Sequence, residues 1–236
     1  RLFAYGAAAA GTAAGVGFYY GTKKAVEASS DLNESVNASN AIFEDNGGQI
    51  QKWSRQAADG FGLARSEALQ AASSIGAMLK PMGFATDDAA RMSERMVELA
   101  GDMASFNNED PSEMLERIRS GLAGESEPLR RFGVDLRVAA VETFALKRGI
   151  IEEGDALEGA AFARAAYQKI LADTTDQQGD FARTSDGLAN AQRRLRANTI
   201  DLLATFGTAF RPMIQGAAND VNEFLLQVKD DRGAGG

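Results

Sequence analysis

The chain has 236 residues and a net charge of −8, and it contains neither cysteine nor histidine. These absences exclude disulfides, thiol nucleophiles, a histidine general base and the usual zinc, haem and iron–sulfur ligands. The acidic balance argues against sequence-specific binding of nucleic acid, which needs a basic surface. Hydrophobic residues make up 44%, enough for a packed core, but many are alanines, which favour helix and bury little area. We therefore expect thin helix-on-helix contacts.

Residues 1–24 form an apolar segment rich in glycine and alanine, with LFAYGAAAAGTAAGVGFYY at positions 2–20. Its length is about the 20 residues that cross a bilayer as a helix. Glycines four residues apart let helices approach closely, and aromatic residues at both ends resemble interfacial belts. The segment is either a transmembrane helix or a helix buried against copies of itself. The residues predicted for this membrane or oligomer contact are Gly11, Gly15, Gly17, Phe18, Tyr19, Tyr20 and Gly21.

Residues 25–80 predict a long amphipathic helical region. Its first part is polar up to Asp45, and Gly47-Gly48 interrupt it. From Gln49 to Lys80 apolar residues recur at steps of three and four, as on one face of a helix. The sequence Lys80-Pro81-Met82-Gly83 predicts a stop. Thr86 is the predicted cap of the next helix, whose apolar stripe comprises Ala89, Met92, Met96, Leu99 and Met103.

Residues 81–150 predict a compact helical module. Asp110 and Pro111 are a cap and first residue for one helix, and Gly124 and Gly149 are predicted helix ends. The residues predicted for packing or partner contact are Phe106, Leu122, Arg130, Arg131 and Phe132, with Leu115, Ile118, Leu129 and Leu136 as further core residues. For the two arginines the expected partners are Glu125, Glu127 or another protein.

Residues 151–232 predict further helices, and residues 233–236 a flexible end. The expected elements are a helix at 156–174, a polar joint at 180–186, a long helix from Leu188 to Phe210 that ends near Pro212, and a last helix at 213–228. Alternating β-branched residues, which would indicate strands, are absent. The predicted fold class is all-α, an extended multi-helix chain with short helix-joint-helix units.

No residue pattern indicates an enzyme. The paired acids, such as Asp87-Asp88, are neighbours whose side chains diverge by about 100° on a helix, so they are poorly placed to share one substrate. The loop at residues 121–126 lacks the Gly-Lys-Ser/Thr ending of a phosphate loop. We therefore predict no catalytic, cofactor-binding or metal-binding residues.

Two passages stand out, AGDMASFNNEDPSEMLERIRSGLAGESEPLRRFGVDL at 100–136 and GDFARTSDGLANAQRRL at 179–195. Both resemble the helical core of phage tail tape measure proteins, within a likeness that extends from about Ser66 to Ala197. The resemblance implies a fragment of a longer structural protein that forms a homo-oligomeric coaxial bundle, a trimer or a hexamer, in the tail lumen or tip of the virion. Its implied partners are tail tube and tail tip proteins, and the host membrane when DNA is delivered across the envelope.

A tape measure sets tail length because a helix converts residue number into distance, at about 1.5 Å per residue. The repeated caps between Thr86 and Gly149 instead indicate a folded module, so we expect a docking or terminal part of such a protein. The alternative is a membrane-associated helical protein of bacterial origin, a pore-forming toxin or a secretion translocator. A soluble coiled-coil scaffold is a weaker alternative, because glycine and proline interrupt the heptads.

Overall fold

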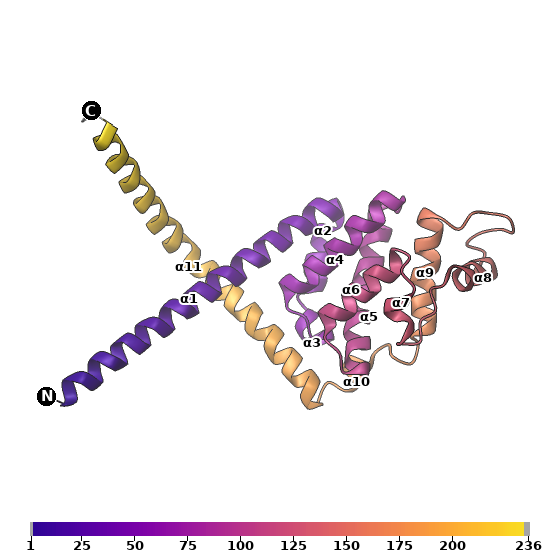
Figure 1. The fold of residues 1–236 in the computed structure, drawn as a ribbon, viewed down its shortest axis with the longest axis horizontal. Coiled ribbons are helices and arrows are strands. Elements are labelled where there is room, and N and C mark those ends of the chain that lie inside the picture. The colour runs from indigo at the N-terminus through magenta and orange to yellow at the C-terminus, as the bar shows by residue number, and fades with distance from the viewer. Residues whose placement is uncertain (1, 234–236) are drawn as a thin grey trace. The chain divides into compact units, whose positions relative to one another are not determined.

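The computed structural model describes the backbone of residues 2–233 and the side chains of residues 21–212. Within residues 2–233 the chain is helical and contains no strand, which confirms the all-α prediction (Figure 1). The α-helices are α1 (Leu2–Phe43), α2 (Gly47–Ser54), α3 (Ala57–Phe61), α4 (Arg65–Leu79), α5 (Thr86–Asn107), α6 (Pro111–Leu122), α7 (Glu127–Arg130), α8 (Val138–Arg148), α9 (Gly159–Asp173), α10 (Asp180–Arg183) and α11 (Leu188–Gly233), with 3-10 turns η1 (Glu44–Asn46) and η2 (Lys80–Met82).

The chain divides into two compact units. The central unit comprises residues 33–199, and the terminal unit comprises the chain up to residue 32 together with the chain from residue 200 onward. In the central unit α5 packs against both α4 and α6. Its core side chains, fully or almost fully buried, are Leu69 and Ile75 on α4, Met96, Leu99 and Met103 on α5, and Met114 and Ile118 on α6. The predicted apolar stripe of α5 is thus the middle of the core.

Several helix ends in the central unit follow from single residues. Asp110 caps α6 by accepting hydrogen bonds from the amide nitrogens of Ser112, at 2.8 Å, and Glu113, at 3.4 Å. Gly124 and Gly149 lie in the left-handed region, with φ of +106° and +66°, and end α6 and α8 as predicted.

The prediction that Thr86 caps α5 is wrong. Ala85 holds the extended cap position, and Thr86 is already the first helical residue. The Asp87 carboxylate accepts from the amide of Asp88, which lowers the pKa of Asp87. An acidic side chain in the first turn therefore satisfies one of the amides that a threonine cap would have served.

The predicted helix over residues 49–80 is three helices, α2, α3 and α4. The chain turns at Gly62, where φ is +76°. A side-chain carbon at Gly62 would lie 2.8 Å from the Phe181 ring, so a residue distant in sequence occupies the space beside this turn. The periodicity of the apolar residues carries no information about that contact, and it therefore overstated the length of the helix.

Two predictions near the C-terminal end are also wrong. Residues 180–183, expected in a polar joint, form α10, and α11 continues through Pro212, where a stop was expected. Proline removes only its own N–H bond to the carbonyl four residues earlier, and the flanking residues keep theirs. Arg211, next to Pro212, also donates to the Ser29 carbonyl at 3.2 Å, a contact outside its own helix.

The described side chains of the terminal unit meet where α1 and α11 cross (Figure 1). Ala25 and Gly207 are buried there, and a side-chain carbon at Gly207 would overlap the Ala25 carbonyl oxygen. The hydroxyls of Ser29 and Thr208 are hydrogen-bonded at 3.2 Å. The two helices therefore touch through small residues and the backbone.

Candidate functional site at the junction of the two motif segments

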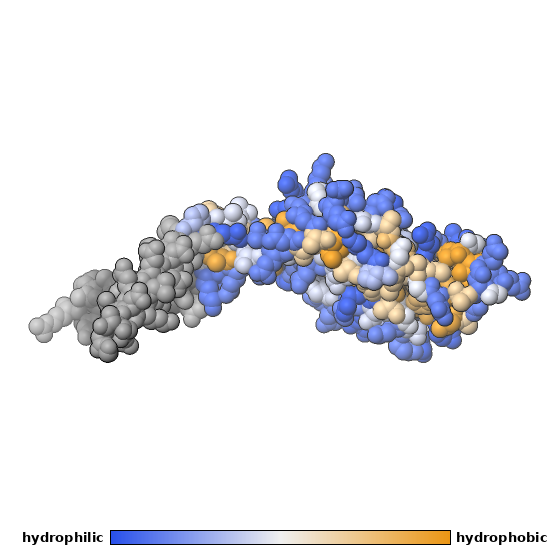
Figure 2. Space-filling view, turned by 90° about the horizontal axis from the view of Figure 1, so that it is seen from above, coloured by the Kyte–Doolittle hydropathy of each residue, from blue (hydrophilic) through white to orange (hydrophobic). Residues whose placement is uncertain are grey.

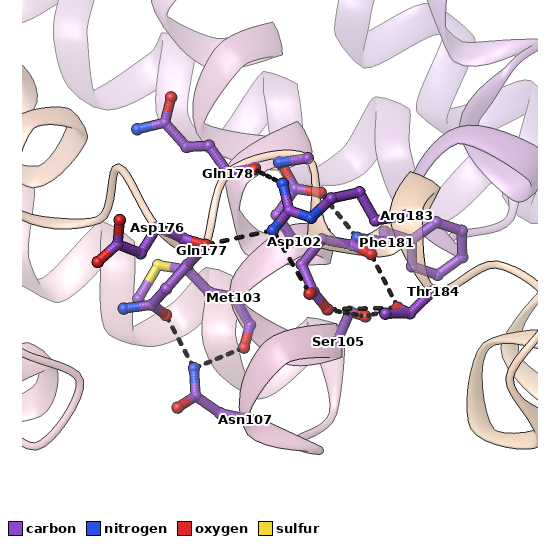
Figure 3. A network of polar contacts seen from close by, with 12 residues as sticks. Asp102, Met103, Ser105, Asn107, Asp176, Gln177, Gln178, Phe181, Arg183 and Thr184 are labelled. Carbon is purple, nitrogen blue, oxygen red and sulfur yellow. Dashed lines mark hydrogen bonds and ion pairs between the residues drawn. The ribbon is translucent and has the colours of Figure 1, made fainter.

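A network of hydrogen bonds surrounds Asp102 on α5 (Figure 3). The Asp102 side chain is only 8% exposed, and its carboxylate accepts from the amide nitrogens of Gly179, at 2.7 Å, and Phe181, at 3.2 Å. These amides belong to the first turn of α10 and the residue before it. The Asp102 carboxylate on α5 thus acts as the N-terminal cap of α10 and holds α10 against α5.

The electrostatic environment of Asp102 contains opposing effects. Burial raises the pKa of its carboxyl group above the ordinary value, while the two amide donors and the nearby Arg95 lower it. The burial effect is the larger one. Arg95 also donates to the Gln178 side chain at 2.7 Å, so the segment just before α10 is bound to α5 a second time.

One turn further along α5, Ser105 connects α5 with α10 and α11. Its hydroxyl donates to the Asp180 carboxylate at 2.6 Å and accepts from the Asn190 side chain at 2.8 Å. Asn190 also donates to the Thr184 hydroxyl at 2.9 Å. Asn190 is buried at the start of α11, so the network fixes where this long helix begins.

The network reaches the loop after α7 through two amide side chains. Asn107 donates to the Gln177 side-chain oxygen at 2.8 Å, and Gln177 donates to the Phe132 carbonyl at 2.9 Å. Arg193 on α11 donates to the Glu109 carbonyl at 2.9 Å. Residues 100–136 and 179–195, the two segments that carry the resemblance, are therefore bonded directly to each other.

The network is suited to positioning more than to reaction chemistry. Most of its side chains bridge two elements, and the Ser105 hydroxyl is engaged both as donor and as acceptor. Across the residues that the structure describes, no three or more acidic side chains gather in a way that could hold a metal ion. Such buried, mutually bonded polar groups give rigidity and a defined geometry to the elements that they join.

A shallow hollow of about 440 Å³ lies beside this network. It is lined by Ser105, Phe106, Asp180, Thr184, Gly187, Leu188, Ala189, Asn190 and Arg193, all from the two motif segments. Phe106 is 52% exposed and Leu188 is 75% exposed, so both present apolar surface at this hollow. The face of the molecule seen in Figure 2 is mainly hydrophilic, with apolar residues in separate small patches.

The predicted contact residues fall into two groups. Leu122 and Phe132 are buried in the central unit, together with Ile118, Leu129 and Leu136, and Leu115 is partly exposed. Phe106 was predicted beside them, but its side chain points away from the core and borders the hollow. Phe106 directly follows Ser105, whose side chain is turned to α10 and α11, so the neighbouring position is left at the surface.

The two predicted arginines form ion pairs within the chain. Arg130 pairs with Glu127 at 2.7 Å, one of the two acids expected for it. Arg131 instead pairs with Glu109 at 2.7 Å and stacks its guanidinium over the Phe132 ring at 4.5 Å. The Arg131 contact connects the loop after α7 with the start of α6, which the sequence spacing did not indicate.

The predicted membrane or oligomer contact falls mostly outside the described side chains. This applies to Gly11, Gly15, Gly17, Phe18, Tyr19 and Tyr20, whose backbone belongs to α1. Gly21 is described; it is exposed, and no atom from outside its own stretch of helix lies within 4 Å of where its side-chain carbon would be. Within the residues that the structure describes, no helix has the length and apolarity to cross a membrane.

Sequence reasoning missed the residues at the centre of this junction. Asp102 lies three residues after Leu99, on the apolar stripe of α5, and a charged residue on such a stripe is a signal for a buried hydrogen-bonding role. Gln177 and Asn190 have no comparable signal, because they lie in a loop and at a helix start where polar residues are usual.

Comparison of the chain with family models, with curated proteins and with solved structures gives no match.

Proposed function

We propose that this chain is part of a phage tail tape measure protein, and that its central unit is a docking module and not part of the linear gauge. The observation that carries this proposal is the junction just described. The two segments that resemble the tape measure family are far apart in sequence, yet they share one hydrogen-bond network through Asp102, Ser105 and Arg193. Segments that resemble one family are expected to act as a unit if the resemblance reflects a common fold.

The helix lengths favour a module over a gauge for residues 44–187. A gauge needs helices laid end to end, so that each residue adds about 1.5 Å. In this region the longest helix, α5, has 22 residues, and α4, α5 and α6 pack side by side. Because helices packed side by side overlap along their axes, the length of the region does not grow in proportion to the number of residues. By contrast, α1 and α11 have 42 and 46 residues and are long enough to contribute to an extended region.

The proposed location is the lumen or tip of the tail in the virion, with several copies of the chain around the tail axis. The exposed hollow beside Phe106 and Leu188 is the surface that we assign to docking with a tail tube or tail tip protein. The delivery of DNA across the host envelope is the later step in which the resemblance implies a role for the parent protein.

Two changes in the parent gene test the proposal. An in-frame deletion within residues 49–80 tests the gauge: a module predicts tails whose length does not fall in proportion to the deletion. Asp102→Ala tests the junction, because it leaves two buried amides without an acceptor. Tail length is measured by electron microscopy, and infectivity by plaque titre. We expect Asp102→Ala to give tails of normal length and at least a roughly tenfold lower titre, since the module is destabilised.

Asp45→Ala, at an exposed aspartate of η1, is the matched control and should change neither measurement. Tails shortened by about 1.5 Å per deleted residue would make the region a gauge and contradict the module. Normal tails and normal titres in both variants would contradict the tape measure assignment of this segment.

A further inference from the structure

The contact between α1 and α11 differs from an ordinary helix contact in what it buries. Among the described residues of the terminal unit, the buried ones are Ala25, Ser29, Ala204 and Gly207. Each has a small side chain or none. Burial of apolar area supplies most of the free energy that holds helices together, and alanine, serine and glycine supply little of it.

Polar bonds provide the rest of this contact. The hydroxyls of Ser29 and Thr208 lie 3.2 Å apart, and Arg211 donates to the Ser29 carbonyl at 3.2 Å and to its hydroxyl at 3.3 Å. When a contact opens, bonds to water replace such bonds, so each neutral one contributes little net stability, while those from the charged Arg211 contribute more. The described part of the contact therefore relies on small buried side chains and polar bonds and encloses little apolar area.

Helix α11 is continuous at this point but lacks one of its backbone hydrogen bonds. Pro212 follows Arg211 directly, and a proline within a helix leaves the carbonyl four residues earlier, here that of Thr208, without its usual amide donor. Gly207 adds a second residue of low helix propensity within the same stretch. Kinks in helices are commonly found at such positions.

We propose that Ala25, Ser29, Gly207, Thr208 and Arg211 form a releasable clasp, which lets α1 and α11 separate while residues 33–199 stay folded. The clasp stands on the contacts above. Its use rests on the proposed function: once it opens, the two long helices are free to extend along the tail. Because the central unit keeps its own core, the opening does not require that unit to unfold.

Thiol labelling measures the opening, because the chain has no cysteine and each variant then carries a single reactive thiol. Ser29→Cys reports on the clasp, and Ser93→Cys, at a fully buried position of α5, reports on the central unit. Each full-length variant is reacted with 5,5′-dithiobis(2-nitrobenzoate) in native buffer, and its rate is divided by the rate in urea. We expect the thiol of Ser29→Cys to react at least about 100-fold faster than that of Ser93→Cys on this scale, as local opening precedes global unfolding.

Three further variants serve as controls for the labelling experiment. Ala204 is also buried in the terminal unit, but its side chain makes no hydrogen bond. Fast labelling of Ala204→Cys would therefore show that the opening is not caused by the loss of the Ser29 hydroxyl. Gly207→Val, added to each reporter variant, should raise the labelling rate of Ser29→Cys at least about tenfold and leave that of Ser93→Cys unchanged, because the added side chain collides with the Ala25 carbonyl. Gly21→Val, placed where no atom lies within 4 Å, should change neither rate.

Equal protection of the thiols in all three reporter variants would overturn the clasp, since the contact would then open only when the whole chain unfolds. That result would leave the tape measure proposal standing, because tail length and titre test it separately. Conversely, fast labelling of both Ser29→Cys and Ala204→Cys would support the clasp even if the phage experiment failed.

Discussion

In the central unit the buried side chains are large, with Phe43, Phe181, Leu99 and Met103 fully enclosed. In the described part of the terminal unit they are alanine, serine and glycine. Both regions are helical, so the difference does not arise from secondary structure. It arises from the area that each region removes from water, which is the main source of its stability. We therefore expect the central unit to respond strongly to the loss of side-chain volume, and the terminal unit to respond mainly to its addition.

The largest effect should come from Phe181→Ala. Phe181 is fully buried against Gly62 and its backbone is held by Asp102, so its removal leaves a cavity at the junction. We expect the free energy of unfolding to fall by about 4 kcal/mol in urea titrations. The matched change Phe106→Ala, at a ring that is 52% exposed, should cost less than about 1 kcal/mol. Equal effects would remove the distinction between core and hollow.

Gly101→Ala is the next largest, and it tests whether close contact through glycine also operates in the central unit. A side-chain carbon at Gly101 would lie 2.7 Å from the Phe61 carbonyl oxygen and would collide with the Phe61 side chain. Thermal unfolding should show a loss of about 2 kcal/mol from overpacking. Gly60→Ala, in α3 with no atom within 4 Å, should be neutral or stabilising by up to about 1 kcal/mol. A neutral Gly101→Ala would show that α3 moves away easily.

Glu94→Gln should have a smaller effect that depends on pH. Burial raises the pKa of the Glu94 carboxyl above its ordinary value of 4.5. A raised pKa in the folded state means that Glu94 favours folding most below about pH 4, and that this contribution is lost as pH rises through the folded pKa. The glutamine variant should therefore be more stable than the natural chain at pH 7, by no more than about 1 kcal/mol, and the difference should shrink at pH 4. Urea titrations at both pH values measure it, and a difference that grows at pH 4 would contradict the burial argument.

The smallest effect should come from Arg130→Ala. Its ion pair with Glu127 lies at the surface, with both side chains more than 60% exposed. Solvent screens such pairs, so the expected loss of stability is below about 0.5 kcal/mol. Lys169→Ala is a useful contrast, because the Lys169–Asp173 pair is largely buried and its loss leaves Asp173 without that partner. Chemical denaturation of both variants compares them, and the loss should be larger for Lys169→Ala.

Much of the fold follows from local chemistry. The cap at Asp110, the left-handed ends at Gly124 and Gly149, and the buried face of α5 all depend on residues within one or two turns of each other. Such interactions are readable in a sequence because their partners are close along the chain. The predicted joint at residues 180–186 failed for the opposite reason: the acceptor for the first amides of α10 is Asp102, which is distant in sequence.

The candidate site was only half accessible to sequence reasoning. The two segments that form it were recognised from their residues, but neither their contact nor the roles of Gln177 and Asn190 could be derived from spacing. A division into domains from sequence assigns consecutive residues to each domain. It therefore cannot group residues up to 32 with residues from 200 onward, as the tertiary contacts do.

By itself, the sequence determined that this chain is helical, that it contains no thiol or imidazole side chain, and where helices such as α6 and α8 end, because helix propensity, capping and composition act locally. Only the tertiary structure decided that residues 100–136 meet residues 179–195, that Phe106 faces solvent while Phe132 is buried, and that Gly207 admits the backbone of Ala25. Those outcomes depend on burial and on hydrogen bonds between residues far apart in the chain, which no local pattern encodes.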